Sequence, residues 1–224
     1  MNKLNFLRGL PLFSNLEDKE LREISRFTYE KRVKKGNVLF SQGEQGSTLY
    51  LIIKGKVKVV LIGESGKELV LAILKKGDFL GEMSIIEDEA RSATAIALEP
   101  TVFLTIDKEN FISFLTKNPK AMLGVLKELS KRLRNADEKI GELAFQNVYE
   151  RVISYLNALA KTRGVKEKEG LFISELPTKR EIADFIGSTR ESVSRVLNDL
   201  HRKGFISLYR KSVIIKKKLS IDKL

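Results

Sequence analysis

Seven apolar residues between Met122 and Leu143 recur with gaps that alternate between four and three. This is the heptad spacing of a coiled-coil seam, and no proline or β-branched run interrupts it between Lys120 and Phe145. We therefore predict a long helix over residues 119–145 that pairs with a second copy of the chain. The alternative is an ordinary amphipathic helix packed on its own domain. The predicted seam consists of Met122, Leu126, Leu129, Leu133, Ala136, Ile140 and Leu143.

Short apolar runs separated by glycines fill residues 27–107. Eight of the fifteen glycines fall between Gly36 and Gly81, and the runs between them have the length of strands. Strands of this length at turn spacings of about ten residues are typical of an antiparallel sandwich or barrel. No strand–helix alternation occurs, which argues against a doubly wound parallel sheet. The clearest runs are residues 49–53, 57–62 and 69–74.

Two local patterns lie outside these regions. Ser14, with Glu17 three residues later, has the pattern of a capping box and predicts a short helix that ends near Arg26. Residues 161–170 are rich in charge and contain two glycines, so we expect an exposed loop there.

A glycine turn leads into a short predicted helix within residues 79–86, and an acidic tip and then Arg91 follow. A free helix N-terminus beside an arginine suits an anion, because backbone N–H groups and the positive end of the helix dipole point outward. The alternative is that Gly81 only turns the chain and Arg91 is a solvated surface charge. On the residues alone, the two interpretations are equally good.

The positive charge of the chain is concentrated in its last third. The net charge is +12, and residues 148–224 hold 17 lysines and arginines against 9 acidic residues. This asymmetry predicts a polyanion partner for that segment. Nucleic acid is favoured over a membrane, because no strongly amphipathic basic helix with aromatic anchors is present.

The rare residue types exclude several chemistries. The chain has no cysteine and one histidine, His201, which excludes disulfides, cysteine-ligated iron–sulfur clusters, thiolate zinc sites and His-rich metal sites. The sequence has no nucleophile–base pair and no P-loop, so we do not expect an enzyme. It also has no signal-peptide core and no apolar run of membrane-spanning length, so we expect a soluble cytoplasmic protein.

A helix-turn-helix pattern lies in the basic segment. Thr178 and Glu181 form a capping box at the start of a short helix, Gly187 gives the turn, and a second helix is predicted over Arg190–Lys203. Gly204 stands at the C′ position where such a helix ends. The winged version of the motif is completed by two predicted strands, residues 205–208 and 213–215.

The second helix of this motif is the expected DNA reader, because arginine pairs bidentately with guanine and glutamate accepts from the cytosine amino group. We expect Arg195 to contact a base, whereas Arg190 suits either a base or a phosphate. Ser188 or Thr189 caps the helix; with Ser188 as the cap, Glu191 serves a capping box instead of a base. The candidate DNA contacts are Thr178, Lys179, Ser188, Thr189, Arg190, Glu191, Ser194 and Arg195, with Arg180, Lys211 and Lys216–Lys218 as further phosphate contacts.

Four segments together resemble the bacterial cyclic-AMP receptor protein/FNR (Crp/Fnr) family of transcription regulators, over nearly the whole chain. The resemblance implies an α+β homodimer with an N-terminal antiparallel β-roll of the jelly-roll, cyclic-nucleotide-binding type, a coiled-coil dimerisation helix and a C-terminal winged helix-turn-helix. The implied domains are residues 1–118, 119–145 and 146–224. The matching segments are Gly77–Glu82, Arg91–Ala93, Glu138–Phe145 and Gly187–Arg195.

The resemblance also implies an effector site. In nucleotide-binding members, a Gly-Glu pair holds the ribose and an Arg-Ser pair holds the cyclic phosphate, and both pairs are present here. In the cyclic-AMP receptor, two hydroxyl residues on the long helix contact adenine, and both are replaced in this chain. The matching residues are Gly81 and Glu82 for the ribose, Arg91, Ser92 and Ala93 for the phosphate, and Ala136 and Asp137 for the base.

Asp137 has two interpretations. It stands at an e position of the heptads, five residues after Arg132 at a g position. Across a parallel dimer these two residues would form an ordinary interhelical salt bridge, which is the simpler interpretation. Alternatively, Asp137 accepts from the base of an effector, and a carboxylate fits the two adjacent donors of guanine better than the single amino group of adenine.

The resemblance predicts a sequence-specific regulator that binds a palindromic operator in double-stranded DNA and contacts RNA polymerase through residues 161–170. A small anionic effector, cyclic AMP or cyclic GMP, would bind between the β-roll and the long helix and shift the dimer toward its DNA-competent arrangement. No iron–sulfur cluster or haem is expected, because the FNR cysteines are absent and His201 lies outside the sensing domain. Two alternatives are an effector-independent regulator of the same fold and a cyclic-nucleotide-binding module without DNA binding, against which Thr178–Arg195 argues.

Overall fold

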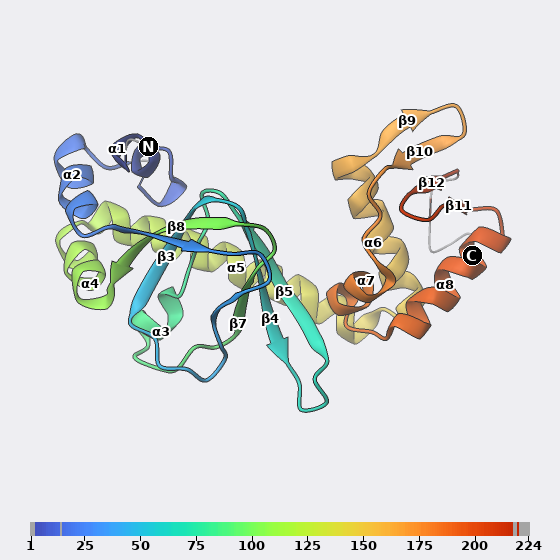
Figure 1. Cartoon of the computed structure of the whole chain (residues 1–224), viewed down its shortest axis with the longest axis horizontal. Helices are drawn as coiled ribbons and strands as arrows, with labels where there is room; N and C mark the ends of the chain where they lie inside the picture. Colours follow the sequence, from blue (N-terminus) through green and yellow to red (C-terminus); the bar gives the residue numbers. More distant parts are fainter. Residues whose placement is uncertain (1–2, 14, 217–218, 220–224) are drawn as a thin grey trace. The chain divides into compact units, whose positions relative to one another are not determined.

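The computed structural model describes residues 3–13, 15–216 and 219, and it has the predicted α+β architecture (Figure 1). Strands pair antiparallel in all three sheets. No helix in the described ranges is both long and apolar enough to span a membrane.

The chain divides into two compact units, and each contains its own hydrophobic core. The first unit comprises Met1–Gly66 and Val70–Ala136, and the second comprises Lys67–Leu69 and Asp137–Leu224. The long helix α5 (Pro119–Phe145) therefore contributes residues to both units.

The strands of the first unit form the predicted antiparallel β-roll from two four-stranded sheets, in the orders β1-β8-β3-β6 and β2-β7-β4-β5. Between the sheets lies an apolar cluster that includes Tyr50, Ile52 and Phe103, with the Tyr50 and Phe103 rings 5.7 Å apart. The strands are β1 (Tyr29–Val33), β2 (Val38–Phe40), β3 (Thr48–Lys54), β4 (Lys56–Ile62), β5 (Glu68–Lys75), β6 (Phe79–Leu80), β7 (Thr94–Ala97) and β8 (Thr101–Asp107).

Short helices pack around the roll and share a second apolar cluster with α5, into which Ala121 and Val125 point. Gly124 lies where a Cβ would be 2.6 Å from the Leu12 carbonyl oxygen, so the N-terminal segment can approach the helix backbone only because this residue is glycine. The helices are α1 (Lys3–Arg8), the 3₁₀ turn η1 (Pro11–Phe13), α2 (Asp18–Arg26), α3 (Glu82–Ile86) and α4 (Lys108–Lys117).

The start of α2 differs from the prediction. The helix ends at Arg26 as expected, but its N-cap is Glu17, whose N–H donates to the Glu20 carboxylate at 2.7 Å. The expected cap, Ser14, lies outside the described residues. Glu17 and Glu20 form the capping box here, and the prediction chose Ser14 and Glu17, which have the same spacing, because serine is the more usual cap.

The second unit is a winged helix-turn-helix. Its core is built by the apolar sides of α6, α7 and α8 against a four-stranded sheet in the order β11-β12-β10-β9. The two strands of the wing and both helices of the motif are confirmed. The elements are α6 (Val148–Arg163), β9 (Val165–Glu167), β10 (Gly170–Ile173), α7 (Lys179–Ile186), α8 (Arg190–Arg202), β11 (Ile206–Leu208) and β12 (Val213–Ile215).

Residues 161–170 do not form the predicted loop. The helix α6 continues to Arg163, and the chain then forms a hairpin in which Glu167 pairs with Gly170 and Val165 with Phe172. The strand β9 was missed because all of its residues are exposed, so it carries no apolar alternation for the sequence to reveal.

The helices α5 and α6 are separated by two residues, each hydrogen-bonded. The Gln146 N–H donates to the Glu142 carbonyl at 3.1 Å and completes the end of α5. Asn147 caps α6, because its side chain accepts from the Glu150 N–H at 3.1 Å while its own N–H donates to the Glu150 carboxylate at 2.9 Å. Both helix ends are therefore satisfied within the junction.

Candidate functional site

The guanidinium of Arg91 is buried inside the β-roll, with 5% of the residue exposed. Its Nη1 donates to the Gly81 carbonyl at 2.9 Å and to Ser84 Oγ at 2.7 Å, and its Nη2 donates to the Thr48 carbonyl at 2.8 Å. Its Cζ lies 4.3 Å from the centroid of the Phe40 ring. The interpretation of Arg91 as a solvated surface charge is therefore wrong.

The positive charge of Arg91 is only partly compensated by the groups around it. Burial lowers the pKa of its guanidinium, and nearby Tyr50, Glu82 and Glu44 partly oppose that shift. The group stays charged at neutral pH, because an arginine does not lose its proton in a protein. Its Nε is buried and has no hydrogen-bond partner, so this cation, held by neutral oxygens, has a donor available for an anion.

Two glycines make room for this arginine. A Cβ on Gly46 would lie 2.2 Å from Arg91 Nε, and a Cβ on Gly81 would lie 2.5 Å from Arg91 Nη1. Gly81 also has a φ of +89°, which other residues rarely adopt. The turn before α3 is therefore a glycine both for its backbone conformation and for the close approach of Arg91.

Glu82 is 3% exposed and forms an ion pair within its own unit. Its Oε1 accepts from Arg132 Nη1 at 2.8 Å, and Arg132 Nη2 donates to the Phe79 carbonyl at 2.6 Å. The Arg132 Cζ also lies 4.6 Å from the Phe79 ring centroid. The second carboxylate oxygen of Glu82 is buried without a partner.

These contacts alter the interpretation of Asp137. The predicted bridge to Arg132 requires a guanidinium that is available at the dimer seam, but Arg132 is turned into the roll toward Glu82 and Phe79. Asp137 and Ala136 are both exposed on α5. Within one chain Arg132 pairs with Glu82, so a bridge to Asp137 across a dimer would have to share or replace that contact, and both interpretations of Asp137 stay predictions.

The remaining effector candidates differ in exposure. Ser92 is exposed, and its Oγ lies 3.5 Å from Met83 Sδ. Ala93 is buried and leads into β7. The structure therefore brings Gly81, Glu82 and Arg91 together inside the roll and leaves Ser92 at its surface.

Most of the predicted seam residues form an exposed apolar face along α5, whereas Leu129 packs against the core of the first unit. Four of them have exposures of 41–65%, while Leu129 and Leu143 are half-buried and Ala136 is exposed. A different face of the helix, at Ala121 and Val125, packs on the first unit. The helix therefore has two apolar faces, and its own chain covers only one of them. The four large exposed residues are Met122, Leu126, Leu133 and Ile140.

In the second unit, the first helix of the motif begins as predicted. The Thr178 side chain accepts from the Glu181 N–H at 3.2 Å, and the Thr178 N–H donates to the Glu181 carboxylate at 2.7 Å. Lys179, the next residue, donates from its Nζ to Ser194 Oγ at 2.8 Å. Lys179 and Ser194, both candidate DNA contacts from different helices, thus lie side by side.

The cap of α8 is Thr189, which accepts from the Ser192 N–H at 3.2 Å. Ser188 is not the cap; its N–H donates to the Ala183 carbonyl at 2.9 Å and helps to close α7. The interpretation of Glu191 as the partner in a capping box with Ser188 is therefore wrong, because with Thr189 as cap the third helical residue is Ser192. Glu191 is exposed.

The predicted base contacts on α8 lie at the surface of the unit. Arg190 and Arg195 are exposed, and among the described residues Arg195 donates to Ser192 Oγ, at 3.2 Å. His201 Nδ1 lies 3.1 Å from the Ile206 carbonyl and so ties α8 to the wing. Of the basic residues after the wing, Lys217 and Lys218 lie outside the described residues.

Two family models match the chain. Residues 30–118 match the cyclic nucleotide-binding domain, and residues 150–219 match the Crp-like helix-turn-helix domain. The CRP-like cAMP-activated global transcriptional regulator of Mycobacterium tuberculosis is 30% identical over 204 residues, which are 91% of each chain. The chain belongs to the Crp/Fnr family of transcription regulators.

One further relative supports the family, and one solved structure shares the fold. The cAMP-activated global transcriptional regulator CRP of Salmonella typhimurium is 34% identical over 181 residues, 80% of this chain and 85% of the relative. The solved structure of the c-di-GMP responsive global regulator CLP of Xanthomonas campestris matches with a TM-score of 0.79 at 24% identity, over 90% of this chain and all of that one. The latter likeness concerns the fold alone.

This Crp/Fnr regulator also has site residues that the sequence did not indicate. Phe40, Thr48 and Ser84 hold Arg91, and Arg132 holds Glu82. No local signal marks Phe40 or Thr48, because strands far apart in the chain bring them to the arginine. Ser84 lies three residues after Gly81, in the first turn of α3, and this spacing alone does not indicate that it contacts Arg91.

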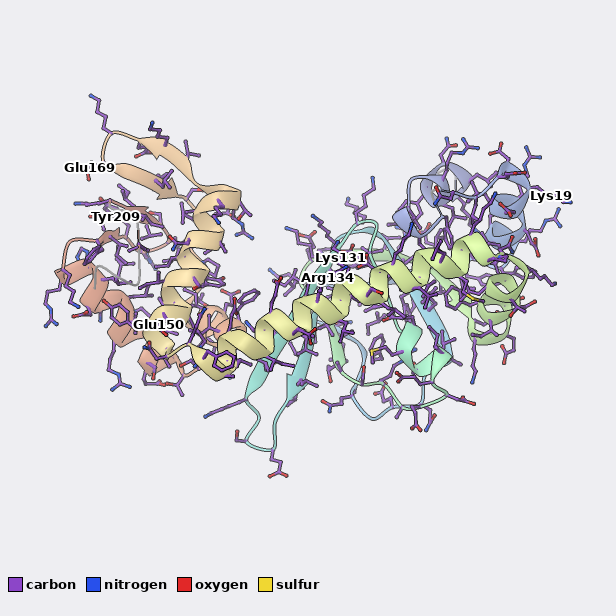
Figure 2. The ribbon with its side chains drawn as sticks, turned by 180° about the vertical axis from the view of Figure 1, so that it is seen from behind. Lys19, Lys131, Arg134, Glu150, Glu169 and Tyr209 are labelled. Atoms are coloured by element: carbon purple, nitrogen blue, oxygen red, sulfur yellow. The ribbon has the colours of Figure 1, made fainter. Side chains whose placement is uncertain are left out.

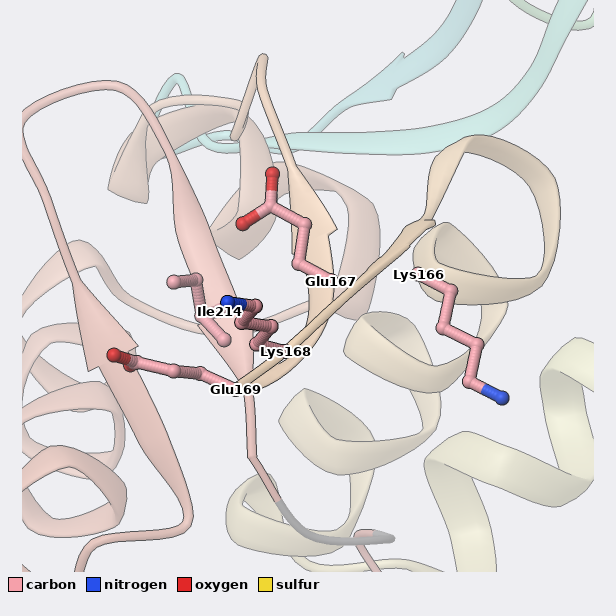
Figure 3. A pocket seen from close by; sticks show the side chains of 5 residues that line it. All are labelled: Lys166, Glu167, Lys168, Glu169 and Ile214. Carbon is pink, nitrogen blue, oxygen red and sulfur yellow. The ribbon is translucent and has the colours of Figure 1, made fainter.

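A hollow beside the β9–β10 hairpin of this Crp/Fnr regulator has a different character (Figure 3). Its lining alternates in charge, and Glu169 lies 3.8 Å from Lys216. Figure 3 shows the Lys166 side chain directed away from the other labelled residues. The hollow therefore presents mixed surface charges and no convergent set of polar groups. It is lined by Lys166, Glu167, Lys168, Glu169 and Ile214.

Proposed function

We propose that this chain is a homodimeric transcription regulator whose DNA binding is controlled by a cyclic nucleotide. One observation carries the effector part of the proposal: two buried polar atoms in the roll, Arg91 Nε and Glu82 Oε2, lack hydrogen-bond partners. The first needs an acceptor and the second needs a donor. A cyclic nucleotide supplies both, because its phosphate accepts and its ribose hydroxyl donates.

Each residue then has a role in binding. Arg91 and Ser92 would hold the cyclic phosphate, with the guanidinium already aligned by neutral oxygens and by the Phe40 ring. Charge-assisted hydrogen bonds are about twice as strong as neutral ones, so a phosphate competes well for the Arg91 donors. Glu82 would accept from the ribose, and its pairing with Arg132 orients the carboxylate.

Dimerisation would cover the second apolar face of α5. Full burial of a large aliphatic side chain contributes roughly 1.5–3 kcal/mol, and four such side chains are exposed on this face. The heptad spacing matches two such helices side by side. This proposal assigns the dimer helix to residues 119–145, with a sensing domain before it and the DNA-binding domain after it.

The exposed side of α8 would enter the major groove of DNA. Arg195 and Glu191 would read bases, Arg190 would contact a base or a phosphate, and Lys179 with Ser194 would contact the backbone. A two-fold dimer meets two half-sites, so the operator would be a palindrome. The hairpin β9–β10, whose turn projects charged side chains, would contact RNA polymerase in the cytoplasm, and the chain would act without catalysis of its own.

The effector-independent regulator is favoured by a different observation. Arg91 already has three acceptors, and Glu82 already has a cationic partner, so the sensing domain is well packed with its own side chains. A regulator of this kind would bind DNA equally well with and without nucleotide. Its activity would then follow its concentration.

One titration separates the two candidates. A palindromic duplex selected by the full-length protein from a randomised library is titrated at fixed salt, alone, with cyclic AMP and with cyclic GMP, by fluorescence anisotropy. We expect DNA affinity to rise about tenfold or more with one nucleotide, as is usual for allosteric coupling. Equal affinity in the three conditions contradicts gating and leaves the effector-independent regulator standing.

Matched variants make this titration specific. Arg91→Gln removes the charge that would hold the phosphate and should abolish the nucleotide effect. Lys76→Gln removes an exposed charge elsewhere in the same unit and should keep it. Failure to select any DNA sequence would contradict the DNA-binding part of the proposal.

A further inference from the structure

A groove of about 300 Å³ lies on the first unit between α5, the N-terminal segment and the turn before β6. Small-molecule sites in proteins begin at about this volume. The approach of Leu12 to Gly124 holds one wall, and Gly77, with a φ of +97°, turns the chain at the other. The lining consists of Leu12, Asn15, Gly77, Asp78, Phe79, Lys120, Leu123, Gly124, Lys127, Glu128 and Lys131.

The charges of this groove are unequally matched. Within the part of the chain that the structure describes, Lys120, Lys127 and Lys131 have no ion-pair or hydrogen-bond partner, and all three are exposed. The two carboxylates are engaged: Asp78 accepts from the Lys75 N–H at 2.8 Å, and Glu128 lies 3.5 Å from Arg132 Nε. The unmatched charge of the groove is therefore positive.

The spacing of the lysines selects an extended anion. Lys120, Lys127 and Lys131 are seven and four residues apart, which places them along roughly 16 Å of one helix side. Lysine ammonium groups bind phosphate oxygens as point charges. A compact monovalent anion would meet only one of them, whereas a chain of linked phosphates would meet two or three.

We propose that this groove binds a small polyphosphate anion, such as an inorganic polyphosphate or the phosphate chain of a nucleotide. The exposed side chain of Leu123 lies among the lysines and offers apolar contact to whatever carries the phosphates. Figure 2 labels Lys131 on α5, together with Arg134, which is on the same helix but does not line the groove.

The groove is also connected to the proposed effector site. Glu128 and Phe79 line it, and both contact Arg132, which in turn pairs with Glu82 at 2.8 Å. Arg132 Nε is buried without a hydrogen-bond partner. An anion beside Lys127 and Lys131 repels the Glu128 carboxylate toward that nitrogen and so weakens the hold of Arg132 on Glu82. This coupling rests on the proposed function.

Direct binding tests the site. Full-length protein is titrated with sodium tripolyphosphate by calorimetry at constant ionic strength, with sodium sulfate as the reference anion. We expect saturable binding of one tripolyphosphate per chain, about tenfold weaker or more in the double variant Lys127→Gln/Lys131→Gln, because hydrogen bonds between charged groups are lost. Arg134→Gln, the matched control on the same helix, should bind as the wild type does.

Three outcomes overturn the proposed site. The first is no saturable binding at millimolar tripolyphosphate, and the second is equal binding of sulfate. The third is a failure of the double variant to differ from Arg134→Gln: an equal loss in both would indicate surface charge in general, and no loss in either would mean that the anion binds elsewhere. The melting temperatures of all variants should match, because the three side chains are exposed.

The coupling has its own measurement. The Kd for cyclic AMP, measured with and without saturating tripolyphosphate, should differ at least about fivefold, and Glu128→Gln should bring the ratio toward one. Tripolyphosphate binding with a ratio of one in the wild type overturns the coupling. Tripolyphosphate binding by a protein that binds no nucleotide contradicts the proposed function while it supports the groove.

Discussion

Arg91 and Arg195 carry the same guanidinium in opposite surroundings. Arg91 is 5% exposed, has three neutral acceptors and lies over an aromatic ring, whereas Arg195 is exposed and donates to one serine hydroxyl. A buried charge is poorly screened by salt, and its loss destabilises the fold that surrounds it. An exposed charge is screened and costs the fold little when it is lost. In the sensing region the residues proposed to bind the ligand also stabilise the fold. In the DNA-reading region the residues proposed to bind DNA contribute little to stability.

The largest expected effect is on stability in the sensing region. Arg132→Met leaves the Glu82 carboxylate, with 4% of its side chain exposed, without its cation. Removal of one partner of a buried pair typically costs 3–5 kcal/mol, so we expect the free energy of unfolding to fall by about 3 kcal/mol. Urea denaturation measures it. The double variant Arg132→Met/Glu82→Gln should recover most of the loss, and no recovery would assign the effect to packing of Arg132 on Phe79.

The second effect is on DNA binding without a change in stability. Arg195→Ala should weaken binding to the selected operator by about 1–3 kcal/mol and relax the preference at one base position, because a bidentate base contact is lost. Arg190→Ala should reduce affinity for all sequences and lower the slope of log Kd against log salt, if its contact is to phosphate. Equal losses on specific and random DNA for Arg195→Ala would make Arg195 a phosphate contact too.

The third effect concerns the identity of the effector. Because Arg132 pairs with Glu82 within its own chain, a bridge from Asp137 would compete with that pair, and the alternative role of Asp137 as an acceptor for the base can be tested directly. Asp137→Ser should shift the ratio of the Kd values for cyclic GMP and cyclic AMP by about tenfold toward cyclic AMP, since one charge-assisted hydrogen bond is lost. Competition with a fluorescent nucleotide measures both values, and an unchanged ratio would exclude Asp137 from base recognition.

The smallest effect is on the pH dependence of the DNA-reading unit. Hydrogen bonds from Arg202, Lys203 and Tyr149 lower the pKa of the Asp199 carboxyl from 3.8 to about 2. A lowered pKa in the folded state means that the stabilisation is complete above the unfolded value and is lost as the pH falls from about 4 to about 2. The urea midpoints of the wild type and Asp199→Asn should therefore differ at pH 5 and converge toward pH 2. A constant difference would show that the contacts act independently of the charge.

The sequence predicted most reliably those elements whose signals are local. The heptads gave the α5 range of residues 119–145, and the capping box at Thr178 gave the start of α7. Gly204, with a φ of +74°, follows α8 as the C′ rule requires. Each of these patterns depends on residues that are only a few positions apart in the sequence. Distant parts of the chain therefore have little influence on whether the helix forms.

The contacts of the sensing site could not be predicted in the same way. The family resemblance indicated Gly81, Glu82 and Arg91 as site residues, but it did not indicate what surrounds Arg91. The three oxygens that accept from Arg91 come from β3, the turn before α3 and α3 itself, and β3 is far from Arg91 in the sequence. The pairing of Arg132 with Glu82 was missed for a related reason. Its heptad position defines its side of the helix, whereas the neighbour it contacts, Glu82, is fixed by tertiary packing 50 residues away in the chain.

The position of the N-cap of α8 determines the surroundings of Glu191. Ser188 and Thr189 are both good caps, and intrinsic preference separates them only weakly. The structure uses Thr189, and this choice releases Glu191 from the backbone. A shift of one residue in a cap thus decides whether a carboxylate is available to a base.

The junction between α5 and α6 has a mechanical consequence. Because Gln146 completes one helix and Asn147 with Glu150 starts the next, the backbone N–H groups at the junction are each satisfied within one helix or the other, and one long side-chain contact, from Ser154 Oγ to Gln146 Oε1 at 3.4 Å, spans it. Rotation about the ψ torsion of Gln146 leaves the hydrogen bonds of both helix ends intact and loosens this side-chain contact. A change in the angle between the helices therefore requires no melting of either helix, and the barrier to reorientation is set by what the helices touch, not by the chain that joins them.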